Sequence, residues 1–232
     1  IKVQKMIKAY FAFLFFSLLT FTTNAQLTVI PDSAFEQELI DQEIDSDGMI
    51  NGTVATADIE NLTSLEVLVN TNITSLVGLQ DFQSLETLRL EALGILQVDI
   101  SALSNLNDFT LGFMSENFLG IDLSANTNLR QLDILYMPGL NSLDVTSLTN
   151  LESLRIEDTP ITTLDLSTNI ALESLFLENE LTDVASEPHI DLTELDLSAN
   201  IALKTVVTYN LLLPSFDVLV FWCWDRSLFS KL

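Results

Sequence analysis

Apolar residues recur along the chain at two fixed spacings, and both have the period of extended structure. Residues 151–169, LESLRIEDTPITTLDLSTN, show them with apolar anchors at Leu151, Leu154, Ile156, Ile161, Leu164 and Leu166. Two apolar residues separated by one residue point to the same face of a β-strand. One short strand cannot bury its apolar face alone, so the pattern predicts that equivalent strands stack beside it.

The first spacing, leucine-x-x-leucine-x-leucine, returns every 20 to 23 residues. Successive units begin at Leu65, Leu85, Leu106, Leu129, Leu151, Leu172 and Leu203. The last interval is 31 residues, because it contains an insertion around ENELTDVASEPHID. This period is that of leucine-rich repeats. We therefore predict a leucine-rich-repeat solenoid over residues 61–210, with six or seven units, a short parallel β-strand ladder and irregular returns.

A second apolar pair encloses an aspartate in five of the returns. The aspartates are Asp99, Asp122, Asp144, Asp165 and Asp196, and serine or threonine follows two residues after each. Because the flanking apolar residues point into the core, each aspartate must point outward. The carboxylates either accept hydrogen bonds from N–H groups of the turn, or relieve their mutual repulsion by binding calcium. The turn role is the favoured interpretation.

The segment before the repeats predicts an amphipathic helix. In IPDSAFEQELID, Ser33 and Glu36 form a capping-box pattern, and Phe35, Leu39 and Ile40 share one helical face. A solenoid needs a cover over its first open core layer. We therefore predict that residues 26–60 form an N-terminal helical cap.

The stretch EIDSDGMIN within this cap is similar to part of a calcium-binding loop. With Gly48 at the sixth loop position, Glu43, Asp45 and Asp47 fall at the first, third and fifth positions. The twelfth position is Val54 instead of the bidentate glutamate that such loops use. Two interpretations follow, a calcium site at these three carboxylates or a structural Asp-Gly turn. No other cofactor is expected.

The two ends of the chain differ from the repeats. Lys5 and Lys8 precede an apolar stretch from Ala9 to Phe21, and a small residue, Ala25, precedes Gln26. This order predicts a signal peptide at residues 1–25 and a secreted or cell-surface protein, with a retained signal anchor as the alternative. The apolar run is shorter than the ~20 residues of a membrane helix, so we expect no membrane span in the mature chain. We interpret residues 211–232 as an atypical tail from a truncated or out-of-frame reading.

The charge balance restricts the partners. The chain has 33 acidic and nine basic residues, a net charge of −24. Residues 26–210 hold 31 acidic residues but only four basic ones, a net charge of −27. Such a surface repels phosphate backbones, so nucleic acid is not an expected partner. It suits divalent cations or basic partners, or serves solubility alone.

Residues for catalysis are scarce. Cys223 and His189 are the single cysteine and histidine, so neither a disulfide within the chain nor a Cys/His zinc site can form. A nucleophilic triad would have to use His189, and no phosphate-binding loop or HExxH motif occurs. We therefore expect no enzymatic activity.

With its units in view, the chain resembles the secreted leucine-rich-repeat proteins of Bacteroidetes-type bacteria, and it is more distantly similar to internalin-like repeats. The matching phrases are IPDSAFEQELID, NITSLVGLQDFQSLETL at residues 72–88, and the related IDLSANTNL at residues 121–129 and LDLSTNIAL at residues 164–172. The resemblance covers about residues 26–210. It implies an exported bacterial recognition or adhesion protein without catalysis.

The outward positions of the strands are the expected binding surface, because a solenoid usually binds through its strand face. The residues that we select there are Arg89, Phe113, Asp133, Tyr136, Arg155 and Phe176. Exposed aromatic rings among acids suit contact with a protein or a glycan. The alternative is a solvated face on which Asp133 and Arg155 form a weak cross-strand pair.

Three functional classes follow from this sequence. The first is an extracellular binding or adhesion module that recognises a protein or glycan through the strand face. The second is a structural spacer that forms a fragment of a larger cell-surface protein. The third, a hydrolase that uses exposed acids, would need carboxylates converging in a pocket, which an open solenoid face rarely provides.

Overall fold

The computed structural model describes residues 26–179, 189–209 and 211. The signal peptide expected at residues 1–25 lies outside these residues, as does the atypical tail from residue 212 onward. Across the described ranges, no helix is long and apolar enough to cross a membrane.

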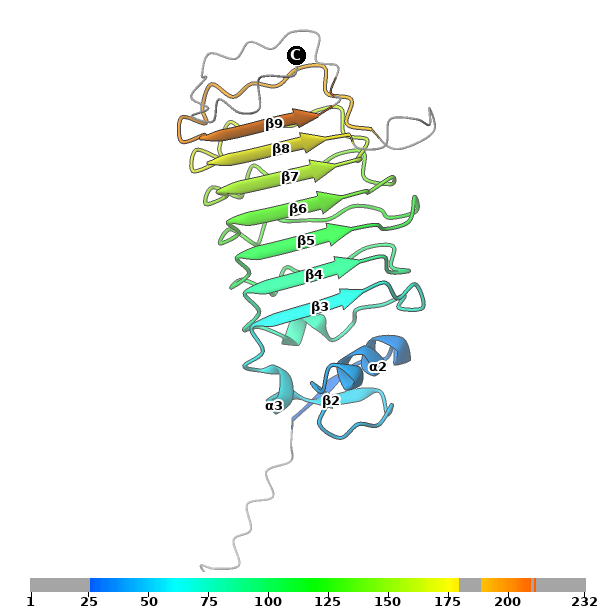
Figure 1. Ribbon diagram of the computed structural model, residues 1–232. Helices are drawn as coiled ribbons and strands as arrows, with labels where there is room; N and C mark the ends of the chain where they lie inside the picture. Colours follow the sequence, from blue (N-terminus) through cyan, green and yellow to red (C-terminus); the bar gives the residue numbers. More distant parts are fainter. Residues whose placement is uncertain (1–25, 180–188, 210, 212–232) are drawn as a thin grey trace, which may run out of the picture.

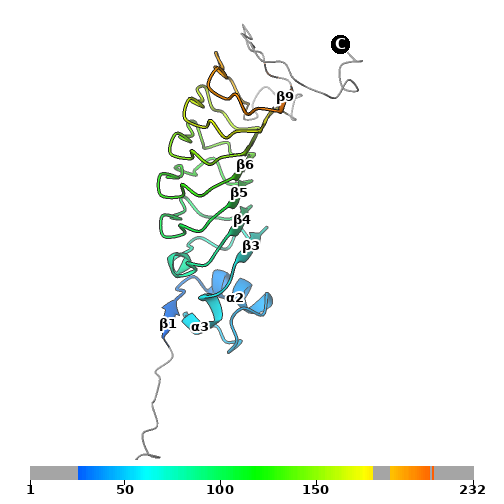
Figure 2. The ribbon, with the colours of Figure 1, turned by 90° about the vertical axis from the view of Figure 1, so that its left-hand side faces the viewer.

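One short strand from each unit joins a seven-stranded parallel sheet, in chain order (Figure 1). The strands are β3 (Ser64–Leu68), β4 (Thr87–Glu91), β5 (Asp108–Gly112), β6 (Gln131–Leu135), β7 (Ser153–Glu157), β8 (Ser174–Glu178) and β9 (Thr205–Tyr209). In Figure 2 the strands line one side of the solenoid and the returns line the other. The predicted leucine-rich-repeat solenoid is therefore confirmed.

The second and fourth residues of the strands β4 to β8 form the core. Leu88 and Leu90 of β4 are fully buried, and the register places Leu88 opposite Phe109 and Leu90 opposite Leu111. Stacking brings equivalent side chains ~4.8 Å apart, so each layer covers the next. Burial of each leucine contributes roughly 1.5–3 kcal/mol, which makes the ladder the main source of stability.

The register of the first unit differs from the prediction. Units that begin at Leu65 and Leu85 predict Leu68 opposite Leu88. In the structure Leu65 lies opposite Leu88, and Leu68 lies opposite Glu91 at the outward end of the strand. Leu62, Leu65 and Leu68 are spaced by three, so the leucine-x-x-leucine pattern fits this segment in two ways. Only pairing with β4 selects one of them, because a shifted register would leave Val67 outside the core, where it is now fully buried.

The insertion before the last strand leaves the ladder intact, since β8 pairs directly with β9. Two buried residues on either side of the insertion, Asn179 and Ile190, are hydrogen-bonded to each other. The N–H of Ile190 donates to Asn179 Oδ1 at 2.8 Å, and Asn179 Nδ2 donates to the Ile190 carbonyl at 3.2 Å. Residues 180–188 lie outside the described part of the chain.

Buried asparagines connect the returns of successive units. Asn126, Asn169 and Asn200 are at most 1% exposed, and each side-chain amide donates to two backbone carbonyls of the preceding unit. The bonds are 2.8 to 3.0 Å long. Buried carbonyls without a partner are costly, so these amides hold one unit against the next. Leu103 and Leu148 stand at the same place in the other units.

The N-terminal cap lies at the β3 end of the solenoid (Figures 1 and 2). It contains the antiparallel strands β1 (Leu27–Val29) and β2 (Thr53–Ala55), and the helices α2 (Ser33–Asp41) and α3 (Thr56–Ile59). Phe35 of α2 is fully buried, and its ring lies 6.4 Å from that of Phe82 beside the short 3-10 helix η1 (Leu79–Asp81) of the first return. The predicted helical cap is confirmed, and its two-stranded sheet is a feature that the sequence did not reveal.

The start of α2 differs from the predicted capping box. Asp32 is the N-cap residue, and its carboxylate accepts the N–H groups of Ala34 and Phe35. Its second oxygen accepts the N–H groups of Thr74 and Ser75, so the same side chain ties the cap to the first return. This tertiary contact favours Asp32 over the adjacent Ser33, which has only one side-chain oxygen.

Residues directly after five of the strands have left-handed backbone. Val69, Ala92, Phe113, Tyr136 and Asp158 have φ between 42° and 56°. Each donates its N–H to the last residue of the next strand, at 2.8 to 3.0 Å. This conformation costs roughly 1–2 kcal/mol for an L-residue, so the backbone is strained at each of these five positions.

Replacing Val69 with glycine is expected to stabilise the protein by about 0.5–1 kcal/mol. Val69 combines a β-branched side chain with a φ of 52° and is 79% exposed, so glycine removes strain and little packing. Denaturant unfolding measures the change. The matched control is Val77→Gly, which alters an exposed valine without a left-handed φ and should lower stability. Equal losses in both variants would contradict the strain argument.

Candidate functional site

Four of the six predicted binding residues share one outward column of the sheet. The register places Asp133 opposite Arg155, and Arg155 opposite Phe176, while Arg89 lies in the same column on β4. All four side chains are partly buried. The structure therefore brings Asp133, Arg155 and Phe176 together on adjacent strands, as the repeat spacing predicted.

The arginines of this column pair with glutamates of the next outward column. Arg89 Nε lies 2.8 Å from Glu91 Oε1. Arg155 Nη2 lies 2.9 Å from a Glu157 oxygen and 3.1 Å from a Glu178 oxygen. Arg155 thus uses these glutamates as ion-pair partners instead of Asp133, the cross-strand pair that the sequence suggested. Two carboxylates surrounding one guanidinium favour this choice.

Two carboxylates on the strand face are held in unfavourable surroundings. Burial raises the pKa of Asp133 above its ordinary value, and the charge of Asp108 raises it further. Arg155 and Arg89 oppose the shift without cancelling it. Burial likewise raises the pKa of Asp108. The centre of the strand face therefore carries desolvated negative charge that a cationic or hydrogen-bonding ligand would relieve.

Asp133→Asn is expected to raise the melting temperature at pH 7, by a few degrees at most. The pKa of Asp133 is raised in the folded state, so its contribution to stability is present at low pH and is lost as pH rises. The gain should therefore disappear below about pH 3.8, where the wild-type carboxyl is neutral in both states. Thermal melts from pH 3 to pH 8 test this, and a shift independent of pH would contradict it.

Phe113 and Tyr136 form a stacked pair at the edge of the strand face. Their ring centroids are 6.0 Å apart with an interplanar angle of 21°, and Phe113 is 51% exposed. Both residues stand at the left-handed position directly after a strand. Phe176 lies within β8 and is not part of this pair. The three predicted aromatics therefore divide into one stacked pair and one separate ring.

Gly112 allows close packing beside this pair. A Cβ atom at Gly112 would lie 3.0 Å from Leu135 Cβ and 3.6 Å from Glu91 Cγ. The glycine thus lets the side chains of the neighbouring strands close over the ladder next to Phe113.

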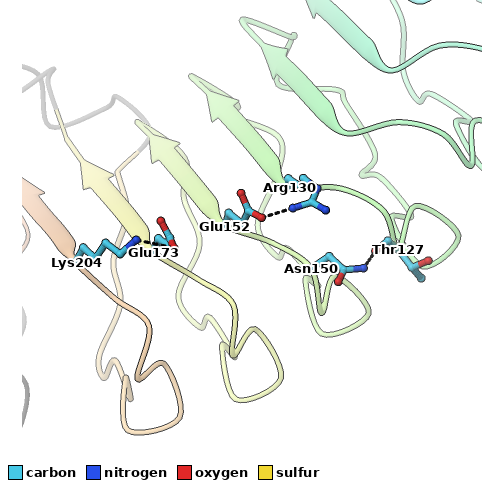
Figure 3. Close-up of polar contacts among 6 residues, drawn as sticks. All are labelled: Thr127, Arg130, Asn150, Glu152, Glu173 and Lys204. Carbon is cyan, nitrogen blue, oxygen red and sulfur yellow. Dashed lines mark hydrogen bonds and ion pairs between the residues drawn. The ribbon is translucent and has the colours of Figure 1, made fainter.

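The described lysine and arginine residues are all paired with glutamates. Besides Arg89 and Arg155, Arg130 pairs with Glu152, and Lys204 Nζ lies 2.7 Å from Glu173 (Figure 3). Figure 3 also shows Asn150 donating to the Thr127 carbonyl of the preceding unit, at 2.9 Å. Among the described residues, no lysine or arginine side chain is left without an ion-pair partner to attract an anionic ligand.

The aspartates of the returns support the turns. Asp99, Asp122, Asp144, Asp165 and Asp196 are exposed, and each Oδ1 accepts the N–H of the serine or threonine two residues later at 2.8 to 3.0 Å. Hydrogen bonds from these residues lower the pKa of every one of the five carboxyls. The predicted outward orientation and turn role are confirmed.

The three carboxylates of the predicted calcium loop have different surroundings. Glu43 is exposed, whereas Asp45 is 5% exposed and its Oδ2 has no hydrogen-bond partner. Burial raises the pKa of Asp45, and the nearby charge of Asp47 adds to the shift. The oxygens of Asp47 accept the Met49 N–H and the Asn51 amide. In the part of the chain that the structure describes, no three acidic, histidine or cysteine side chains are placed to hold a metal ion.

The calcium hypothesis therefore stays a prediction, and thermal denaturation tests it. If Glu43, Asp45 and Asp47 bind calcium, millimolar calcium should raise the melting temperature above that in chelator, because a ligand of the native state stabilises it. Magnesium is the control ion, since it demands a tighter octahedral site. Equal melting temperatures in calcium and chelator would leave the structural turn as the role of this loop.

The comparisons with known proteins identify the fold. No protein-family model and no curated protein sequence matches the chain. Internalin InlF of Listeria monocytogenes superposes with a TM-score of 0.52 at 20% identity, covering 81% of this chain and 59% of that one. InlJ, also of Listeria monocytogenes, gives 0.40 at 20% identity, covering 84% and 50%. Internalin C2 of the same species gives 0.37 at 20% identity, covering 79% and 98%.

The likeness to InlF agrees with the leucine-rich-repeat solenoid seen in the strand ladder. At 20% identity it shows the fold alone. The chain spans less than two thirds of the InlF and InlJ chains that it matches. The class of the protein is thus a leucine-rich-repeat solenoid with an internalin-like fold.

Proposed function

We propose that the protein is an extracellular binding or adhesion module, secreted or displayed at the cell surface. Its partner is a protein or a glycan, and the strand face of the solenoid is the recognition surface. The residues that contact the partner are Arg89, Phe113, Asp133, Tyr136, Arg155 and Phe176. The protein performs no catalysis in this role.

The observation that carries the proposal is the stacked Phe113–Tyr136 pair. Phe113 is half exposed although aromatic side chains usually bury their rings. The pair also occupies two strained left-handed positions. Rigid aromatic rings beside ion-paired arginines and glutamates have the composition of a protein-binding or sugar-binding surface.

The charges of this face limit the partner further. Since Arg89 and Arg155 are neutralised by glutamates, an anionic partner such as nucleic acid finds no free counter-charge on it. A neutral glycan or a protein surface with hydrogen-bond donors matches the outward carboxylates. The likeness of the fold to internalins agrees with a recognition role.

The test compares the binding of two matched double variants to arrays of glycans and of purified extracellular proteins. Phe113→Ser with Tyr136→Ser removes the aromatic pair. Ile170→Ser with Ile201→Ser removes two exposed apolar side chains from the returns. The aromatic variant should bind every ligand found for the wild type about tenfold or more weakly, and the control should bind these ligands as the wild type does. Equal binding by both variants would overturn the strand face as the site.

The alternative function is a structural spacer within a larger cell-surface protein. The observation that favours it is that the chain spans only 59% of the InlF chain. A spacer needs a stable ladder but no ligand. If the wild type binds nothing on either array while remaining folded, the spacer role replaces the binding role.

A further inference from the structure

A groove lies apart from the strand face, beside the aspartate turns of three successive units. It consists of two adjoining hollows of about 770 and 630 Å³, which share Leu119, Gly139 and Asn141 as lining residues. The larger hollow follows the aspartates Asp99, Asp122 and Asp144. The equivalent Asp165 and Asp196 do not line it.

The groove lies where two units are longer than their neighbours. Phe109 and Leu132 are 23 residues apart, and Leu132 and Leu154 are 22 apart, against 21 for the next pair of strands. The extra residues lie in the loops after β5 and β6. There a Cβ atom at Gly139 would come within 2.6 Å of the Glu116 carbonyl oxygen, so a glycine lets the two loops stack closely.

The lining of the groove combines apolar surface with uncompensated negative charge. Leu119 is 76% exposed and Leu96 is 52% exposed, although both are large apolar side chains. The lining contains no basic residue. Asp99, Asp122 and Asp144 are exposed, and Glu116 adds a fourth carboxylate.

These aspartates are already preorganised. A turn N–H group holds Oδ1 of Asp99, Asp122 and Asp144, which fixes each carboxylate at the groove wall. Hydrogen bonds with the following serine or threonine lower the pKa of all three, so they are charged at neutral pH. Asp122 and Asp144 repel each other weakly, and a bound cation would relieve that repulsion.

We propose that this groove binds a cationic, extended peptide segment of a partner protein. Lysine or arginine side chains of the segment pair with Asp122 and Asp144, and an apolar side chain between them packs on Leu119. Charge complementarity selects this occupant over an acidic or purely apolar one. The site is independent of the aromatic pair on the strand face, so either site can fail without the other.

The probe is the fluorescein-labelled peptide acetyl-KLKLKLK-amide, with binding to the full chain followed by fluorescence anisotropy at about 50 mM salt, where screening is weak. Asp122→Asn with Asp144→Asn should weaken binding by about tenfold. Asparagine keeps the Oδ1 acceptor for the turn, so the fold is retained. Asp165→Asn with Asp196→Asn is the matched control, because it removes the same charge from equivalent turns outside the groove and should change the Kd by less than about twofold.

The apolar part of the site has its own matched pair. Leu119→Ser should weaken peptide binding by about fivefold. Ile170 is an exposed apolar residue of another return, so Ile170→Ser should leave the affinity unchanged. A peptide with glycine in place of leucine should no longer distinguish Leu119→Ser from the wild type.

Three results would overturn the groove as a site. In the first, the wild type does not bind the peptide. In the second, the Asp122/Asp144 and Asp165/Asp196 double variants weaken peptide binding equally, which would indicate general attraction to an acidic surface. In the third, the double variant Phe113→Ser with Tyr136→Ser no longer binds the peptide while the groove variants still bind it. That result would place the peptide on the strand face.

Discussion

Glu36→Ala is expected to lower the free energy of unfolding by about 2–4 kcal/mol, because it leaves several backbone N–H groups without their acceptor. Glu36 is fully buried in α2, and its carboxylate accepts the N–H groups of Asn51, Gly52 and Thr53 at 2.8 to 3.0 Å. These bonds join the helix to the loop that leads into β2. Without them the loop loses its attachment and the side chain leaves a cavity.

The measurement is urea unfolding of the full chain, with two companion variants. Glu36→Gln keeps one acceptor oxygen but turns an amide toward backbone donors, so its loss should be smaller than that of alanine. Glu38→Ala is the matched control on the same helix, because Glu38 bonds only to the exposed Gln42 amide. It should change stability by less than about 0.5 kcal/mol. A Glu36→Ala variant as stable as this control would contradict the anchoring role.

Asn169→Asp is expected to cost about 3–5 kcal/mol, because it places a charge in the core of the returns. Asn169 is fully buried, and its amide donates to the carbonyls of Val145 and Leu148 at 2.9 and 2.8 Å. Aspartate removes both donors and opposes two carbonyl oxygens with a carboxylate. Such a loss is a large part of the 5–15 kcal/mol that typically separates folded from unfolded protein.

Two further variants separate charge from shape. Asn169→Leu introduces the residue that occupies this position in other units, as Leu148 shows, so its loss should be smaller than that of aspartate. Asn128→Asp is the exposed control, since Asn128 donates only to the Ser104 carbonyl at the surface. It should cost less than about 1 kcal/mol. If Asn169→Asp and Asn128→Asp unfold at the same urea concentration, the buried asparagines do not hold the units together.

The repeat spacing was sufficient to predict the columns of the sheet. Arg89, Asp133 and Arg155 lie in one outward column because every strand has the same period. The outward aspartates were equally predictable, since their apolar neighbours had to face the core. Both predictions depend only on alternation along a strand, which is a local property of the backbone.

Predictions that required a choice between similar residues were less secure. Leu62, Leu65 and Leu68 fit the leucine pattern in two registers, and pairing with β4 decides between them. Asp32 and Ser33 are both good N-cap residues, and the contact with Thr74 of the first return favours Asp32. Arg155 had three carboxylates within reach, and the strand geometry selects Glu157 and Glu178.

Other features had no signal in the sequence. The left-handed positions after the strands are occupied by valine, alanine, phenylalanine, tyrosine and aspartate, which share no conformational preference. Each of these residues donates its N–H to the next strand, and the stacking of Phe113 on Tyr136 is seen only when both loops are in place. The groove beside Leu119 had one indication, the 22- and 23-residue units, but its depth depends on how those loops pack.

The sequence by itself determined that this chain is a capped leucine-rich-repeat solenoid and, from the second unit to the sixth, which strand residues face its core and which face outward. It did so because a repeated spacing must be satisfied in the same way by every unit. Only the tertiary structure decided the register of the first unit, the partners of the charged side chains, the aromatic pair and the groove. Those depend on distances between atoms of different units, which no periodicity along one chain can specify.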